Sequence, residues 1–232
     1  MNKKISVIMS VYNDEQNIEN AILGIINQTY KNFEFLIIDD CSSDSTKEIL
    51  EKFKKLDNRI QIYNNKKNIG LTKSLNILLK ASQGEFIARQ DSDDVSLIDR
   101  FEKQLIELKK ENVVGCATRA IVKNSSRVTP NKSYFLPKKF VMNIKNPFVH
   151  GSLLLEREEV MRVGGYDENF YYAQDYKLMS DLLNLNKKIT ILKEPLYVLN
   201  LKNNISTKFK EEQNYYAYCV RKNTKPIRKA AI

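Results

Sequence analysis

Strand-like and helix-like segments alternate along the first hundred residues, and this alternation restricts the chain to few folds. Residues 5–11 and 33–38 are nearly continuous apolar runs, typical of strands buried on both faces, and shorter strand candidates follow at 59–63 and 85–89. Between them, apolar residues recur at helical spacing at 18–26, 49–56 and 71–81. Alternation at this pace implies right-handed crossovers, so we expect an α/β protein with a mostly parallel, Rossmann-like sheet flanked by helices.

Local signals extend this pattern along the chain. Ser45-Thr46-Lys47-Glu48 predicts a capping box at a helix start, and Asn13 or Asp14 could cap the helix before it. Further along, the pattern predicts helices at 97–110, 156–163 and 175–185, and strands at 113–117, 149–155, 189–192 and 196–201. Gly164-Gly165 should end the second of these helices.

Polar groups follow three of the expected strands at the point where each strand ends. They are Ser10-Val11-Tyr12-Asn13, Asp39-Asp40 and Asp91-Ser92-Asp93. In open parallel sheets, ligands bind beyond the carboxyl ends of the strands. The sequence therefore predicts one crevice lined by these three segments.

The last of these segments is the most acidic. Asp91, Asp93 and Asp94 end an apolar strand, and such clustering of like charge is favourable mainly when a cation lies among the carboxylates. Oxygen ligands without nearby Cys or His suit Mg²⁺ or Mn²⁺. An acidic turn before a helix N-terminus explains the segment about equally well, with Asp94 as the cap.

The chain has a formal net charge of +10, and the excess is regional. Residues 121–149 contain six Lys or Arg and no Asp or Glu, and residues 201–232 carry a comparable excess. A basic surface predicts attraction to an anionic partner. The alternative is a solvated basic surface and a disordered tail.

Three further observations limit the class of protein. No apolar run approaches the about 20 residues that a membrane-spanning helix needs, and the first residues do not resemble a signal peptide, so we expect a cytoplasmic protein. The three cysteines are widely spaced and predict reduced thiols. His150 is the single histidine, which excludes multi-histidine zinc chemistry.

Taken in order, the polar and glycine motifs resemble those of family 2 glycosyltransferases with the GT-A fold. The resemblance runs from residue 5 to about residue 186 and rests on these segments: 6–13, Gln28-Thr29-Tyr30, Ile37-Ile38-Asp39-Asp40, Asn68-Ile69-Gly70, Gly84-Glu85, Asp91-Ser92-Asp93-Asp94, Gly164-Gly165-Tyr166-Asp167 and Gln174-Asp175-Tyr176. It implies a GT-A domain at 1–200, with a nucleotide-binding half at 1–118 and an acceptor-side half at 119–200, followed by a basic segment at 201–232.

The resemblance also implies an activity. The expected reaction is inverting transfer of a hexose or N-acetylhexosamine from a UDP-sugar to a hydroxyl of a saccharide or lipid-linked saccharide in surface-glycan assembly. Mn²⁺ or Mg²⁺ would assist. The clustered Lys and Arg, and not the resemblance, predict that the basic loop and tail face an anionic membrane peripherally or a lipid-diphosphate acceptor. No sequence feature indicates an oligomeric state.

On the donor side, the resemblance gives each residue a task. Ser10 and Tyr12 would line the nucleoside pocket, and Asp40 would accept a hydrogen bond from the uracil N3–H. The neighbouring Asp39 would be a strand-end or helix-capping residue. Lys73 could reach the diphosphate or ribose, or be an ordinary solvated lysine. Asp91 would hold the ribose or metal-bound water, and Asp93 would coordinate the metal.

On the acceptor side, Asp175 matches the catalytic base of the family, although an N-cap aspartate is the simpler interpretation. Arg89 could fix a carboxylate of the acidic cluster. His150, Gly165 and Gln174 are candidate acceptor or phosphate contacts; a lone His is more often a packing or hydrogen-bonding residue.

The chain departs from the family pattern after Pro195. Relatives commonly carry an Arg and then a His, a metal or diphosphate ligand in some, where this chain has Leu199 and Leu201; Asn204 and Ser206 fit the pattern. One metal ligand is therefore missing or supplied differently.

Two other classes of function fit parts of the sequence. A metal-dependent nucleotidyl or phosphoryl transferase uses the same carboxylate-metal chemistry, and would release pyrophosphate or a nucleoside monophosphate instead of UDP. A non-catalytic nucleotide-sugar or nucleic-acid binding protein would use the basic patches and tyrosines. An acidic crevice would repel a phosphate backbone, which argues against nucleic acid.

Overall fold

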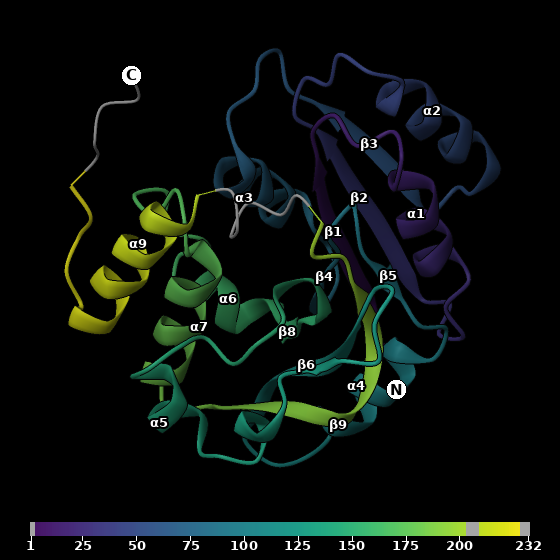
Figure 1. Ribbon diagram of the computed structural model, residues 1–232. Coiled ribbons are helices and arrows are strands. Elements are labelled where there is room, and N and C mark those ends of the chain that lie inside the picture. Colours follow the sequence, from purple (N-terminus) through teal and green to yellow (C-terminus); the bar gives the residue numbers. More distant parts are fainter. Residues whose placement is uncertain (1–2, 203–208, 228–232) are drawn as a thin grey trace.

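The computed structural model describes residues 3–202 and 209–227, and one curled nine-stranded sheet organises them (Figure 1). The strand order is β3-β2-β1-β4-β8-β6-β9-β5, with β7 paired to β6. The strands are β1 (Ile5–Val11), β2 (Phe33–Asp39), β3 (Ile60–Asn64), β4 (Phe86–Arg89), β5 (Val95–Ser96), β6 (Val113–Val122), β7 (Val128–Thr129), β8 (Leu154–Glu156) and β9 (Lys188–Leu199).

Helices lie on both faces of the sheet, as the alternation predicted. They are α1 (Ile18–Ile26), α2 (Thr46–Leu56), α3 (Leu71–Ala81), α4 (Arg100–Glu107), α5 (Lys138–Met142), α6 (Arg157–Arg162), α7 (Gln174–Asn184) and α9 (Lys210–Lys222), with short 3₁₀ helices η1 (Lys132–Tyr134) and η2 (His150–Ser152). The expected α/β class is confirmed.

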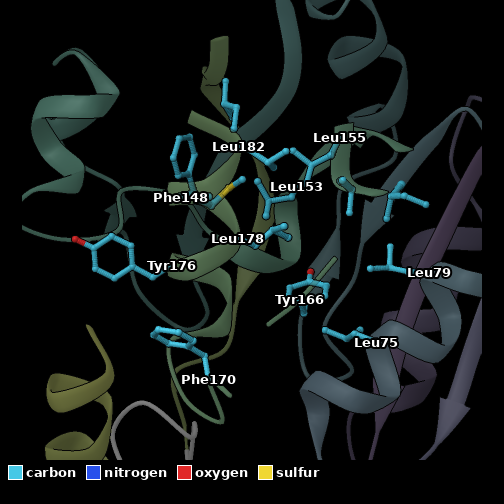
Figure 2. Close-up of a cluster of buried hydrophobic side chains, with 14 of the residues drawn as sticks. Leu75, Leu79, Phe148, Leu153, Leu155, Tyr166, Phe170, Tyr176, Leu178 and Leu182 are labelled. Atoms are coloured by element: carbon cyan, nitrogen blue, oxygen red, sulfur yellow. The ribbon is translucent and has the colours of Figure 1, made fainter. Parts of the chain in front are cut away.

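The apolar run of β1 is continuous because each face of the sheet has its own core. Val7 and Met9 pack with α1, α2 and α4 residues on one face, whereas Ile8 belongs to the core under α3, α6, α7 and α9. Figure 2 shows this second core, where leucines of α3 and α7 meet Leu155 of β8. A strand covered on both faces has no solvated side, so its sequence does not alternate.

β1 pairs in parallel with β2 and β4, and β2 pairs in parallel with β3. Buried Glu34 of β2 holds the starts of these strands together. It accepts hydrogen bonds from Lys4 Nζ (2.7 Å), Ser6 Oγ (2.6 Å) and Gln83 N (2.8 Å). Burial would raise the pKa of Glu34, but these donors outweigh burial and lower it.

The second half of the sheet differs in detail from the sequence expectation. The two short strands expected at 189–192 and 196–201 are one strand, β9, whose irregular register with β6 absorbs the break at Pro195. The strand expected at 113–117 continues to Val122, and the one expected at 149–155 begins as η2. Antiparallel β8 joins β4 to β6, so the sheet is mixed.

The predicted capping box was wrong. Ser45 precedes α2 but its side chain makes no capping hydrogen bond; Asp44 accepts the Thr46 N–H instead, at 3.1 Å. Asp14 does not cap α1 directly, since Asn17 occupies that position. Helix α9 was not predicted, and it is held by Tyr216, Cys219 and Val220, which are buried against the core beside α7. Within 3–202 and 209–227, no helix has the length and apolarity that crossing a bilayer requires.

Candidate active site

Parallel pairing brings the ends of β1, β2 and β4 to one edge of the sheet. Val11 is in register with Asp39, and Ile8 with Arg89, so the residues that follow emerge side by side. The order β2-β1-β4 reverses direction at β1, which is the topological switch point where open α/β sheets bind ligands. The predicted donor-side residues lie at or next to this edge.

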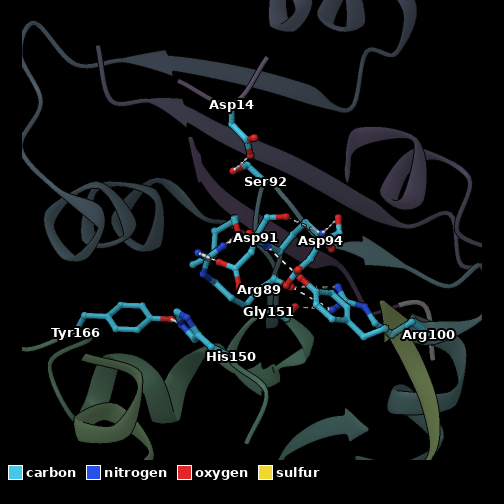
Figure 3. Close-up of polar contacts among 12 residues, drawn as sticks. Asp14, Arg89, Asp91, Ser92, Asp94, Arg100, His150, Gly151 and Tyr166 are labelled. Carbon is cyan, nitrogen blue, oxygen red and sulfur yellow. Dashed lines mark hydrogen bonds and ion pairs between the residues drawn. The ribbon is translucent and has the colours of Figure 1, made fainter. Parts of the chain in front are cut away.

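An acidic cluster occupies the loop after β4 (Figure 3). Burial raises the pKa of Asp93 to about 7, and the neighbouring Asp91 and Asp14 carboxylates add to the rise. Asp14 also accepts a hydrogen bond from Ser92 Oγ at 2.6 Å, so the loop after β1 is tied to this cluster. Because neighbouring negative charges make each carboxylate harder to ionise, a bound cation among them is favourable.

Asp94 has a different task from the expected helix cap. It is buried, and its Oδ1 accepts the Asn200 N–H at 2.6 Å, whereas α4 begins only at Arg100. Burial, with Asp91 and Asp93 nearby, raises its pKa. Asp94 therefore fixes the end of β9 against the acidic loop, and the capping interpretation was wrong.

Two fully buried arginines hold the backbone under the acidic loop. Arg89 forms an ion pair with Asp91, 2.6 Å between Nη2 and Oδ1, and donates to Ile8 O at 3.1 Å. Arg100 donates to Arg89 O at 3.1 Å and to Gly151 O at 2.8 Å. The carboxylate contact anticipated for Arg89 is present, with Asp91 as its partner.

Asp40 is buried, and its carboxylate is already engaged. Its oxygens accept hydrogen bonds from Asn65 Nδ2 (2.8 Å), Ile69 N (2.9 Å) and Gly70 N (2.8 Å), which fixes the loop before α3. Two carboxylate oxygens offer about four acceptor sites, so one stays open for a further donor. Asp39, the alternative, accepts the Ser42 N–H at 3.1 Å.

The other donor-side candidates are more accessible. Tyr12 is half-exposed just beyond β1, and Ser10 is partly buried within it. Lys73 is exposed in the first turn of α3, directly after the loop that Asp40 holds.

His150 of η2 and Tyr166 of the connection between α6 and α7 form a part-buried contact. The His150 Nε2 and Tyr166 Oη atoms are 2.8 Å apart. Burial lowers the pKa of His150, Arg89 lowers it further, and both Asp91 and Asp175 oppose this lowering. The same three charged residues act on Tyr166, whose pKa burial raises. This His–Tyr pair therefore lies within the electrostatic reach of both Asp91 and Asp175.

Asp175 lies in the first turn of α7, one residue inside the helix. The residue before the helix is Ala173, with a left-handed φ of 52°, so the N-cap interpretation of Asp175 was wrong. Its Oδ2 accepts a hydrogen bond from Asn146 Nδ2 at 2.8 Å. Asp175 lines a cavity of about 360 Å³ between the 144–146 segment and α9.

Gly165 and Gln174 lie at the two ends of the connection between α6 and α7. Gly165 has φ +75° and its N–H donates to Val160 O at 3.0 Å, which closes the end of α6 as predicted. Gln174 is buried at the start of α7.

Sequence reasoning missed Arg100 and three further residues that shape this site. Tyr197 of β9 is fully buried and its hydroxyl accepts the Asp91 N–H at 3.2 Å. A Cβ at Gly151 would lie 2.1 Å from this hydroxyl and 2.6 Å from Asp91 Oδ2, so Gly151 is needed for close approach. Asn146 could have been found only as a polar residue beside Pro147 in the basic segment.

The donor set suits a hard divalent cation that takes part of its shell from elsewhere. Among the described residues, no group of three or more His, Cys, Asp or Glu side chains could enclose a metal ion. Asp91 and Asp93 supply carboxylates, and Mg²⁺-type sites commonly combine one or two carboxylates with phosphate and water oxygens. Leu199 and Leu201 cannot coordinate metal, and Asn204 and Ser206 lie outside the described residues.

Comparison with known proteins gives a consistent result. The family model "Glycosyl transferase family 2" matches residues 6–165. An uncharacterized glycosyltransferase of Haemophilus influenzae is 35% identical over 196 residues, covering 78% of this chain and 60% of that protein. The Escherichia coli UDP-Glc:alpha-D-GlcNAc-diphosphoundecaprenol beta-1,3-glucosyltransferase WfgD is 31% identical over 185 residues, covering 78% and 70%. The chain thus spans between half and three quarters of these relatives.

Solved structures share the fold. S. aureus TarS in complex with UDP-GlcNAc superposes with a TM-score of 0.76 at 20% identity, covering 98% of this chain and 68% of that one. The Pyrobaculum calidifontis mannosyltransferase PcManGT, in complex with GDP-Man and Mn²⁺, gives 0.76 at 18% identity, covering 96% and 65%. The curled sheet with helices on both faces is the GT-A fold expected from the motifs.

Proposed function

The chain belongs to glycosyl transferase family 2, and we propose that it transfers a hexose or N-acetylhexosamine from a UDP-sugar, with inversion, to a hydroxyl of a saccharide or lipid-linked saccharide. The product would enter a surface glycan. WfgD, one of the relatives, is named for transfer from UDP-Glc to a diphosphoundecaprenol-linked sugar, and TarS has been solved with UDP-GlcNAc, which supports this donor and acceptor class.

One observation carries the proposal. Asp91 of the acidic loop and Asp175 of α7 both act electrostatically on the His150–Tyr166 pair, whose Nε2 and Oη atoms are 2.8 Å apart, so carboxylates from two segments far apart in the sequence lie near one location. Inverting transfer needs separate groups for the leaving diphosphate and for the attacking hydroxyl, because these two lie on opposite faces of the sugar. We assign Asp91 and Asp93 to the diphosphate side, and Asp175 to the acceptor side.

In the proposed reaction Asp175 takes the proton from the acceptor hydroxyl as that oxygen attacks the anomeric carbon. A positioned general base contributes about 10² to 10⁴ in rate. The Asn146 amide fixes one carboxylate oxygen, which leaves the other for the acceptor. His150, whose pKa is lowered, stays neutral and hydrogen-bonds Tyr166, which keeps this wall of the site in place.

On the donor side, Asp91 is fixed by Arg89 and by its own backbone contact to Tyr197. Asp91 and Asp93 would hold a divalent cation that neutralises charge on the leaving UDP. The remaining acceptor site of Asp40 suits the uracil N3–H. The loop after Asn65, which Asp40 holds, brings Lys73 of α3 toward the same edge.

The test is a donor screen that measures transfer and UDP release, with Mn²⁺ and with chelator. We expect UDP-sugar turnover that depends on Mn²⁺. Asp93→Ala should abolish this metal-dependent turnover. Release of pyrophosphate or a nucleoside monophosphate instead of UDP would identify a nucleotidyl or phosphoryl transferase and refute the proposal.

The base assignment has a matched control on the same helix. Asp175→Asn should lower transfer about 10² to 10⁴ fold while UDP affinity is kept. Asp181→Asn changes an aspartate of α7 that pairs with Lys177 and lines a different cavity, and it should change transfer only a few fold. Full transfer by Asp175→Asn would exclude Asp175 as the base.

A further inference from the structure

Large apolar side chains project from the surface of residues 132–145, which we call the η1–α5 surface. Their exposed fractions are 71% for Phe135, 46% for Leu136, 58% for Phe140 and 64% for Ile144. Exposed apolar residues that occur singly are ordinary, but a group of them on one surface marks an interaction site. Four such residues within ten positions form a group.

The surface is held in place from beneath. Val141 and Met142 of α5 are buried in the core, and the Tyr176 hydroxyl donates a hydrogen bond to Met142 O. The Phe135 ring stacks on Tyr134 with centroids 3.9 Å apart, and the Arg119 guanidinium covers Tyr134 at 4.6 Å. The apolar side chains are therefore exposed on an anchored segment.

Cations alternate with these apolar residues. Lys132, Lys139 and Lys145 are exposed in the same segment, whereas Lys138 Nζ donates to backbone carbonyls within it. The sequence has no Asp or Glu between Glu111 and Glu156. Apolar side chains among lysines match the interfacial region of an anionic bilayer, where rings and aliphatic groups enter the headgroup boundary and ammonium groups meet phosphates. A second copy of this surface would oppose lysine with lysine, and Leu136 and Ile144 suit hydrocarbon better than nucleic-acid bases.

The η1–α5 surface adjoins the cavity that contains Asp175. Ile144, Lys145 and Asn146 line this cavity together with Lys210 and Arg221 of α9. In Figure 1, α5 lies on the side of the molecule away from α1 and α2. A bilayer at this surface would therefore lie next to Asp175 and not next to the nucleotide side.

We propose that the η1–α5 surface docks the protein on an anionic lipid bilayer and so presents the Asp175 cavity to acceptors held in that bilayer. The second half of this statement rests on the proposed function; the first does not. Each exposed lysine of the surface should strengthen partitioning of the protein onto anionic vesicles about fivefold. This electrostatic contribution should weaken as the salt concentration rises.

The test is flotation of the full chain with vesicles of phosphatidylcholine alone or with phosphatidylglycerol added. The wild-type protein should float with the anionic vesicles and much less with the neutral ones. Lys132→Glu with Lys139→Glu should weaken binding about 30-fold or more. Phe135→Ser with Phe140→Ser should also lose binding. The matched control, Lys54→Glu with Lys55→Glu on exposed α2 positions, should float almost like wild type, with a loss well below that of the surface pair.

Several outcomes would overturn the proposal. Equal flotation with both vesicle types, or equal loss in the α2 control, would show that this surface is not the docking site. If the Phe135→Ser, Phe140→Ser variant still bound anionic vesicles like wild type, the apolar side chains would have no part in docking and the proposed surface would be refuted. A dimer in light scattering that the phenylalanine variant abolishes, or displacement of vesicles from the η1–α5 surface by single-stranded RNA, would assign the surface to another partner.

Folding and activity are controlled separately. Each variant's melting temperature and its transfer to a water-soluble acceptor should match wild type, because none of the changed residues lines the Asp175 cavity. Asp175→Asn should float like wild type. Failed flotation with intact turnover would reject docking alone, whereas failed turnover with intact flotation would reject the proposed function alone.

Discussion

Replacing Gly151 by alanine should damage the site more than any other single added methyl group at the glycines described. The new Cβ would lie 2.1 Å from Tyr197 Oη, 2.6 Å from Asp91 Oδ2 and 2.7 Å from Tyr197 Cζ, more than half an ångström short of ordinary contact in every case. Gly151 does not have a positive φ, so the cost comes from space and not from backbone conformation.

The neighbours of Gly151 have little freedom to move away. Tyr197 is fully buried and bonded to the Asp91 N–H, and Arg100 holds Gly151 O at 2.8 Å. Overpacking of this kind costs about 1–3 kcal/mol. Displacing Asp91 by about an ångström would lower turnover by about 10²-fold. We therefore expect a melting temperature several degrees lower together with a large loss of transfer.

The assay compares thermal melting and donor turnover for Gly151→Ala and Gly164→Ala. Gly164 has φ +86° but no atom within 4 Å of its added Cβ, so Gly164→Ala should cost only about 1 kcal/mol of backbone strain and leave turnover nearly intact. If Gly151→Ala melted and turned over like wild type, the tight contact between Gly151, Tyr197 and Asp91 would be refuted.

Two further predictions concern buried carboxylates. Because the pKa of Glu34 is lowered by folding, its stabilisation is present above the unfolded-state value of about 4.3 and is lost as pH falls through the lower folded-state value. Glu34→Gln should therefore destabilise by about 1–3 kcal/mol at pH 7 and by much less near pH 3, as measured by denaturant unfolding; an equal difference at both pH values would contradict this. Asp40→Ala should lower both the melting temperature and UDP affinity, since it leaves the Ile69 and Gly70 N–H groups without their acceptor. If only UDP affinity fell, Asp40 would act on the nucleotide and not on the loop.

The parallel half of the fold could be predicted because its signal is local. The apolar run of β1 and the helical spacing of α1 and α3 follow from burial on both faces of one sheet. The convergence of Val11, Asp39 and Arg89 then follows from parallel pairing alone. The sequence alone therefore predicts the edge that holds Asp91 and Asp93.

The residues that support the site could not be predicted in this way. The local sequence pattern predicts a solvated helix residue at Arg100 and an ordinary strand residue at Tyr197. Both are buried under the acidic loop because of contacts with residues far away in the sequence. The same applies to Asp94, whose partner is Asn200. Local propensity favoured a capping role for Asp94 and Ser45, and tertiary hydrogen bonds prevailed at both positions.

One continuous hydrogen-bonded ladder runs from β3 through β4 and β8 to β6 and β9. β4 leads into the loop of Asp91, and β9 follows directly after α7, the helix of Asp175, so the segments that carry these two aspartates are attached to one sheet. A clamshell movement of two lobes would have to break that ladder between β4 and β8. If the proposed function holds, capture of the donor and acceptor would come from the movement of connecting segments, and the spacing between the Asp91 and Asp175 segments would be set when the sheet folds.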